Sequence, residues 1–97
     1  MLKKSQILSY LKEYKERYKD RYFIDKLGVF GSVARGDESG ESDVDIVVDM
    51  SKPNLLNLSS IRNDLIEHFR TSVDIVALWD NMNPRLKNRI EKEAIYV

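Results

Sequence analysis

The chain has 97 residues, enough for one compact domain and too few for two. Sixteen basic residues balance sixteen acidic ones, which argues against general nucleic-acid binding and against attraction to an anionic membrane. The absence of cysteine excludes disulfides and cysteine-ligated metals and fits a cytoplasmic protein, and no apolar stretch approaches the roughly 20 residues of a membrane span. We therefore expect one cytoplasmic domain over 1–97, with little room to hold a second substrate.

The first predicted element is an amphipathic helix over 5–22. Its apolar and aromatic residues recur at intervals of three and four: Ile7, Leu11, Tyr14, Tyr18 and Tyr22. Together with Tyr10, three of these tyrosines form a stripe at intervals of four. We interpret the stripe as packing residues with their hydroxyls toward solvent; a partner-docking face or self-modification targets are the alternatives.

A short strand is predicted over 24–30, with its ordered part beginning near Leu27 because Asp25 and Lys26 are charged. Gly31 and Ser32 break this strand, and 32–35 are expected to start a short helix. Loop-forming and acidic residues then fill 36–42.

A second strand is predicted over 43–49. A helix with Pro53 in its first turn follows, ending near Arg70 or Thr71, and its inward residues are predicted to be Leu55, Leu58, Ile61, Leu65 and Phe69. The stretch 72–78 is a third strand.

Asn83 is a helix cap followed by Pro84 at the first helical position, which predicts a last helix with Leu86 and Ile90 inward. The last four residues, 94–97, form a short strand or fray. Strands separated by helices favour an α/β fold, here a small mixed sheet of three to four strands packed with helices, with the first two strands able to pair antiparallel.

Asp43 and Asp45 are the most informative residues for chemistry. Residues i and i+2 of a strand point to the same face, so the two carboxylates would lie side by side and repel each other unless a cation lies between them. Oxygen-only ligands of this kind suit magnesium, which binds through one or two carboxylates and substrate phosphates.

Asp74 is the expected third carboxylate, because a charge within a buried strand is costly unless it is paired or metal-bound. If the third strand lies beside the second, three carboxylates around one or two magnesium ions would form a phosphoryl-transfer centre. A solvent-exposed strand edge is the plainer interpretation of Asp74. Asp49 is its rival as third ligand, but it lies about 13 Å from Asp45 along the strand.

Gly31 and Ser32 are candidate phosphate-binding residues. A glycine lets backbone approach a phosphate closely, and amides at a helix start and a serine hydroxyl donate hydrogen bonds to anionic oxygens. An ordinary turn with a helix cap is the alternative for this pair taken alone.

Several further residues have weaker interpretations. His68, which has no second histidine or cysteine nearby, is read as structural or exposed rather than as a zinc ligand. The acidic residues of the loop are solvated, or they gate the site or contact the acceptor: Asp37, Glu38 and Glu41. Trp79 and Asp80 border the nucleotide, or Trp79 caps the core.

Taken together, Gly31-Ser32, ten intervening residues and Asp43-Val44-Asp45 resemble the signature of the DNA polymerase beta-like nucleotidyltransferase superfamily. With its short length, the chain resembles the minimal nucleotidyltransferase branch, whose members are antitoxins paired with HEPN-domain toxins. Asp74 falls where that family places its third carboxylate, so the resemblance covers nearly the whole chain.

The resemblance implies that Asp43, Asp45 and Asp74 bind two Mg²⁺ ions, with Asp74 a possible base toward the acceptor hydroxyl. It implies that Gly31 and Ser32 hold the triphosphate of ATP, and that Arg35 contacts phosphate or locks the loop.

The resemblance further implies transfer of AMP from ATP to a tyrosine hydroxyl of a HEPN toxin, with release of pyrophosphate. A partner protein that supplies the acceptor would also explain how so small a domain handles two substrates. The alternative function is a non-catalytic, nucleotide-binding antitoxin that neutralises its partner by occlusion. The sequence leaves the acceptor residue, the base preference and the possibility of an oligomer open.

Overall fold

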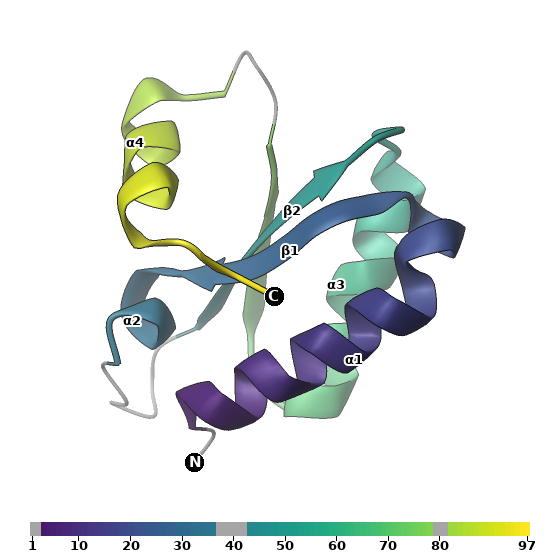
Figure 1. The fold of residues 1–97 in the computed structure, drawn as a ribbon, viewed down its shortest axis with the longest axis horizontal. Coiled ribbons are helices and arrows are strands. Elements are labelled where there is room, and N and C mark those ends of the chain that lie inside the picture. The colour runs from purple at the N-terminus through teal and green to yellow at the C-terminus, as the bar shows by residue number, and fades with distance from the viewer. Residues whose placement is uncertain (1–2, 37–42, 79–81) are drawn as a thin grey trace.

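The computed structural model describes residues 3–36, 43–78 and 82–97. Helices and strands alternate along the chain (Figure 1). The elements are α1 (Lys4–Tyr22), β1 (Ile24–Phe30), α2 (Gly31–Ala34), β2 (Val44–Met50), α3 (Leu55–Phe69), β3 (Val73–Ala77), α4 (Pro84–Glu93) and β4 (Ile95–Tyr96). Among the helices described, none combines the length and the apolar composition that crossing a bilayer requires.

The sheet is mixed and has the strand order β3-β2-β1-β4. β1 pairs antiparallel with β2 and with β4, whereas β2 and β3 run parallel. A β-carbon at Gly28 would overlap with the Ile95 carbonyl, so a glycine there allows β4 to pair closely with β1. The α/β class and the small mixed sheet predicted from the sequence are confirmed. Of the two alternatives left open for 94–97, the short strand is the one that forms, at Ile95–Tyr96.

β1 spans the predicted range 24–30, but its ordered part begins before Leu27. Its first residue is Ile24, and the pairing with β2 shifts register between Ile24 and Lys26. This irregularity places Asp25 and Lys26 on an exposed part of the strand, where their charges stay hydrated. The prediction that charge would delay the strand until Leu27 was therefore wrong.

α3 begins later than predicted. Asn54 is its N-cap, and the Asn54 side chain accepts hydrogen bonds from the amides of Leu56 and Asn57. Pro53 consequently lies outside the helix, and Leu55, predicted to point inward, is 72% exposed. At the other end, Arg70 adopts a left-handed conformation just past Phe69, as helix C-caps commonly do.

The two faces of the sheet bury separate sets of side chains. α1 and α3 cover one face, where Leu11, Ile46 and Leu65 belong to the main core. α4 covers the other face, where Phe30, Val47 and Ile90 form a second, smaller core. Because side chains alternate along a strand, Ile46 points to the first face and Asp45 and Val47 point to the second.

Candidate functional site

The glycine that follows β1 is held in a left-handed conformation that favours glycine. Gly31 has a φ of 69°, and a β-carbon there would overlap with the carboxylate of Asp45. Gly31 is the first residue of the four-residue α2, and Ser32, the second, is 9% exposed. Gly31, one of the two predicted phosphate-binding residues, thus lies against Asp45, a predicted metal ligand on β2.

Asp45 and Asp74 are brought together by the parallel pairing of β2 and β3. They are register partners on adjacent strands and point to the α4 face. Asp43 precedes β2 by one residue and is exposed, as is Asp74, whereas Asp45 is half-buried. The three acids therefore gather around one end of the sheet, although β2 begins at Val44 rather than at Asp43.

The electrostatics of Asp45 record this crowding. Burial raises the pKa of the Asp45 carboxyl, and the nearby charges of Asp74 and Asp43 raise it further, while Arg89 and Arg35 oppose the shift. A divalent cation would relieve the same repulsion. In residues 3–36, 43–78 and 82–97, however, no three His, Cys, Asp or Glu side chains are arranged to hold one metal ion.

Two residues of α4, neither of them predicted from the sequence, complete the site. Glu93 accepts hydrogen bonds from the Gly31 amide at 3.1 Å and from Arg35 Nη1 at 2.9 Å. Arg89 Nε lies 3.4 Å from the same carboxylate, and its guanidinium lies over the Phe30 ring. The i, i+4 spacing of Arg89 and Glu93 was the available signal, but it is also typical of an ordinary helix surface.

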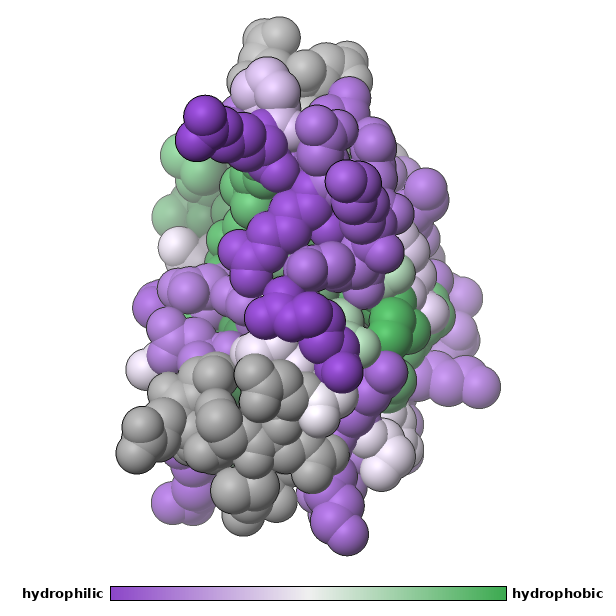
Figure 2. Space-filling model, turned by 90° about the vertical axis from the view of Figure 1, so that its left-hand side faces the viewer, coloured by the Kyte–Doolittle hydropathy of each residue, from purple (hydrophilic) through white to green (hydrophobic). Residues whose placement is uncertain are grey.

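Arg35 is placed by this contact with α4. Its ion pair with Glu93 ties the residue after α2 to α4. The loop that Arg35 was predicted to lock lies mostly outside the described residues. The surrounding surface is strongly polar: Figure 2 looks onto α4, and hydrophilic side chains cross the middle of this face. The exposed basic residues of α4 are Arg85, Lys87, Arg89 and Lys92.

The rival ligand Asp49 lies elsewhere on the α4 face. It is paired in register with Lys26, at the opposite end of β2 from Asp45. There it lines a cavity of about 430 Å³ with Ile90 and Tyr96. The predictions for the acidic loop residues Asp37, Glu38 and Glu41 and for Trp79 and Asp80 lie outside the described residues.

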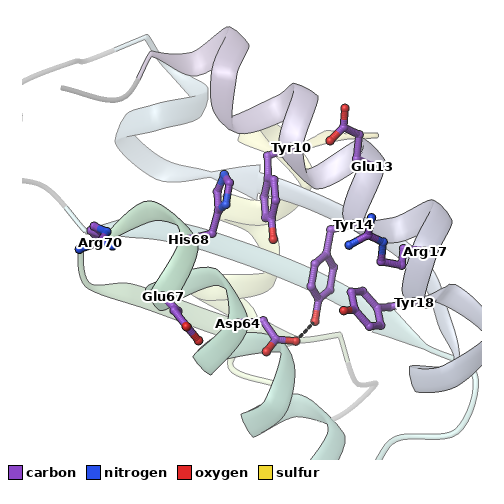
Figure 3. Close-up of a pocket in the computed structure, with 9 residues that line it drawn as sticks. All are labelled: Tyr10, Glu13, Tyr14, Arg17, Tyr18, Asp64, Glu67, His68 and Arg70. Carbon is purple, nitrogen blue, oxygen red and sulfur yellow. Dashed lines mark hydrogen bonds between the residues drawn. The ribbon is translucent and has the colours of Figure 1, made fainter.

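A larger cavity, of about 480 Å³, lies between α1 and α3 on the opposite face of the sheet from Asp45 (Figure 3). The Tyr14 hydroxyl donates a 2.7 Å hydrogen bond to Asp64 there, and Tyr10 stacks on His68 with ring centroids 3.4 Å apart. The prediction of solvent-directed tyrosine hydroxyls is wrong for Tyr14, which is buried. His68 is exposed, as expected.

Comparison with known proteins places the chain in a family. The family described as the nucleotidyltransferase domain matches residues 9–97. The protein adenylyltransferase MntA of Thermococcus cleftensis is 32% identical over 98 residues, a match that covers 100% of this chain and 98% of that protein.

Solved structures share the fold. One solved structure, described as that of a proposed minimal nucleotidyltransferase, has a TM-score of 0.77 and 28% identity. The match covers 97% of this chain and 95% of that one. A second, at 16% identity and a TM-score of 0.62, is a tri-AMPylated HEPN toxin of Shewanella oneidensis in complex with an MNT antitoxin; it covers 96% of this chain and 66% of that one. The paired acids, the glycine-serine turn and these likenesses agree, and the chain belongs to the nucleotidyltransferase domain family.

Proposed function

We propose that this chain is a magnesium-dependent protein adenylyltransferase that moves AMP from ATP to a tyrosine hydroxyl of a HEPN-domain toxin. It would act in the cytoplasm as a single minimal nucleotidyltransferase domain over 1–97. The observation that carries the proposal is the juxtaposition of Asp45 with Asp74 across β2 and β3 and with Gly31 at the end of β1. The activity named for the Thermococcus relative supports the choice of an adenylyl group and a protein acceptor.

The proposed metal ligands are Asp43, Asp45 and Asp74. All three offer only oxygen donors, and the charges of Asp43 and Asp74 raise the pKa of the Asp45 carboxyl. Because a divalent cation would relieve this repulsion, the residues present fit Mg²⁺. When bound, magnesium ions supply charge neutralisation for the triphosphate and for the attacking and leaving oxygens.

The other residues have positioning roles in the proposal. Gly31 and Ser32 hold the triphosphate, and the absence of a β-carbon at Gly31 leaves room for the Asp45 carboxylate beside this turn. Arg35 and Arg89 flank Asp45 and offset negative charge around it. In the transfer, the acceptor oxygen forms a bond to the α-phosphorus, and the bond from that phosphorus to the oxygen bridging the α- and β-phosphates breaks. Pyrophosphate leaves, and the hydroxyl proton passes to the exposed Asp74 carboxylate.

The alternative is a nucleotide-binding antitoxin that blocks its partner without catalysis. One observation favours it: among the described residues, no three acidic side chains are arranged to hold one metal ion. The contacts of Glu93 with the Gly31 amide and Arg35 do not separate the two functions, because both require nucleotide binding. Under this alternative, occlusion would not require transfer of AMP.

The test is to incubate the full chain with ATP, magnesium and a HEPN-domain partner and to measure the partner's mass. We expect added AMP units with the native chain, and none with the double variant Asp43→Asn, Asp45→Asn. Asp49→Asn is the matched control, because it removes a carboxylate from the same strand face at the other end of β2. Transfer that persists in the double variant would refute the metal-site assignment. Inhibition of the partner without any mass change would establish occlusion.

A further inference from the structure

β3 is an edge strand that carries one of the proposed catalytic carboxylates. It lies at the end of the strand order β3-β2-β1-β4, and only its β2 side is paired in the part of the sheet that the structure describes. The Val44 amide donates to the Ser72 carbonyl at 3.0 Å, and the Leu78 amide donates to the Val48 carbonyl at 2.9 Å. The two bonds fix which backbone groups of β3 face β2.

Backbone direction alternates along a strand, so every second residue of β3 faces away from β2. The ladder with β2 uses Ser72, Asp74, Val76 and Leu78. The amide and carbonyl groups of Val73, Ile75 and Ala77 therefore point outward from the sheet.

One outward group is already bonded. The Arg62 side chain of α3 donates from Nε to the Val73 carbonyl at 3.0 Å, which caps the edge at its first residue. Among the described residues, no hydrogen bond involves the outward groups of Ile75 or Ala77. A charged side chain at one end is a common way to restrict where an edge strand can pair. Here it leaves the outward groups of Ile75, which is partly exposed, and of Ala77, which is 5% exposed, without a hydrogen-bonded partner among the described residues.

This part of the edge, without a bonded partner among the described residues, adjoins the proposed site. The side chain of Asp74 points to the α4 face beside Asp45, one residue before Ile75. A strand added outside β3 would place one of its side chains opposite Asp74 on that same face, with β-carbons about 4.5–5.5 Å apart. A hydroxyl-bearing residue at that position would lie next to the proposed metal ligands.

The negative charge near β3 restricts which segments could pair with this edge. Asp43, Asp45 and Asp74 gather at this end of the sheet, and a second copy of the chain pairing through its own β3 would add another aspartate to them. A partner segment whose residues around the hydroxyl are neutral or basic adds no such repulsion.

We propose that the outer edge of β3 at Ile75 and Ala77 binds an extended, neutral or basic segment of the acceptor protein, and that this pairing presents its hydroxyl to Asp74. The inference rests on the proposed function, because it identifies how the acceptor reaches that site. Main-chain hydrogen bonds would supply affinity, and the position opposite Asp74 would select the modified residue.

Amide hydrogen exchange in the full, isotope-labelled chain tests the pairing directly. We expect the outward amides of Ile75 and Ala77 to exchange at least about tenfold more slowly when a HEPN-domain partner is added. The amides of Asp74 and Val76, bonded to β2, serve as internal controls and should change much less. Unchanged exchange at Ile75 and Ala77 in a formed complex would overturn the inference, as would protection in the free chain that rises with its own concentration.

A substitution provides the second test. Ile75→Pro removes an outward amide without removing a bond to β2 and should lower AMP transfer at least about tenfold, whereas Ile75→Val keeps the amide and should transfer normally. Should Ile75→Pro fail to fold by circular dichroism, the exchange measurement decides. If the native chain transfers AMP and a folded Ile75→Pro transfers equally well, the edge proposal fails while the proposed function stands. Absence of transfer by the native chain counts against the function itself.

Discussion

Position 31 combines two features that favour glycine, a positive φ and a close contact where a β-carbon would be. Its φ of 69° is disfavoured for side chains with a β-carbon, and the Asp45 carboxylate occupies the space that a β-carbon would take. Gly36 shares only the first feature: its φ is 79°, but nothing lies within 4 Å of a β-carbon built there. Comparing substitutions at Gly31 and Gly36 therefore distinguishes the effect of backbone strain from the effect of contact with Asp45.

We therefore predict different outcomes for Gly31→Ala and Gly36→Ala. Both should lose roughly 1–2 kcal/mol of unfolding free energy because alanine is strained at positive φ. Only Gly31→Ala should also lower AMP transfer, by at least about tenfold, because its methyl group displaces Asp45. Urea unfolding and the transfer assay measure the two effects, and equal behaviour of the variants in both would contradict the prediction.

At this scale, the sequence predicted the residues that form a local pattern and missed those that do not. Gly31, Asp45 and Asp74 interrupt apolar strands, where a glycine or a charge is conspicuous. Glu93 joins the site from 58 positions beyond Arg35, on an exposed helix rich in charge, where an acid is unremarkable. Only the folding of α4 over the second face of the sheet brings it to Gly31.

Among the elements, α4 controls the arrangement of the site through one carboxylate. Desolvation opposes ionisation of Glu93, but hydrogen bonds and charge from Arg35, with the Gly31 amide and Arg89, hold its pKa below the usual range. The carboxylate stays ionised at neutral pH and links α4 to the start of α2 and to the residue that follows it.

The prediction at this scale is that Glu93→Gln loosens Arg35 and Arg89 and raises the KM for ATP by roughly three- to tenfold, with a smaller change in kcat. Glu91→Gln, on the same helix, is the control, and it should leave the KM unchanged. Steady-state transfer kinetics at varied ATP measure both. A lower KM in Glu93→Gln would mean instead that the Glu93 carboxylate competes with the triphosphate.

Element boundaries were harder to predict than element types. Each helix and strand was expected near its place, but β1 accommodates Asp25 and Lys26 through a register shift, and α3 uses Asn54 rather than Pro53 to begin. In both cases a hydrogen-bonded detail overrode the residue pattern.

For the whole molecule, the contact between α1 and α3 makes the free energy of unfolding decrease at alkaline pH. Burial, followed by the hydrogen bond and charge of Asp64, strongly raises the pKa of Tyr14. The folded state thus favours the neutral phenol. This stabilisation is complete below the unfolded pKa of about 10 and is lost progressively as the pH rises above it.

We accordingly predict that native stability falls above about pH 10 more steeply than that of Tyr14→Phe, by up to about 1.4 kcal/mol per pH unit. Tyr18→Phe, from the same helix face, should follow the native curve. Urea unfolding measured between pH 8 and pH 11, at intervals of about half a pH unit, gives the slope of unfolding free energy against pH for each variant. Parallel curves for the native chain and Tyr14→Phe would contradict the prediction.

The overall architecture was largely predictable because strands and helices alternate and the first two strands are joined by a segment of moderate length, which allows antiparallel pairing. Which strands lie at the edges could not be predicted. The order depends on the pairing of β4 with β1 and of β2 with β3, and the residue pattern within a strand does not specify its neighbour. The proximity of Asp74 to Asp45, which the sequence could state only as a condition, follows from that order.

The sheet also acts as a partition within the molecule. The tyrosines of α1 pack on one face, and Asp45 and Asp74 point from the other. A molecule carrying AMP on Tyr10 or Tyr18 would therefore have received it from a neighbour. Such labelling would proceed at a rate that grows with the square of the protein concentration, whereas labelling within one molecule would grow only in proportion to it.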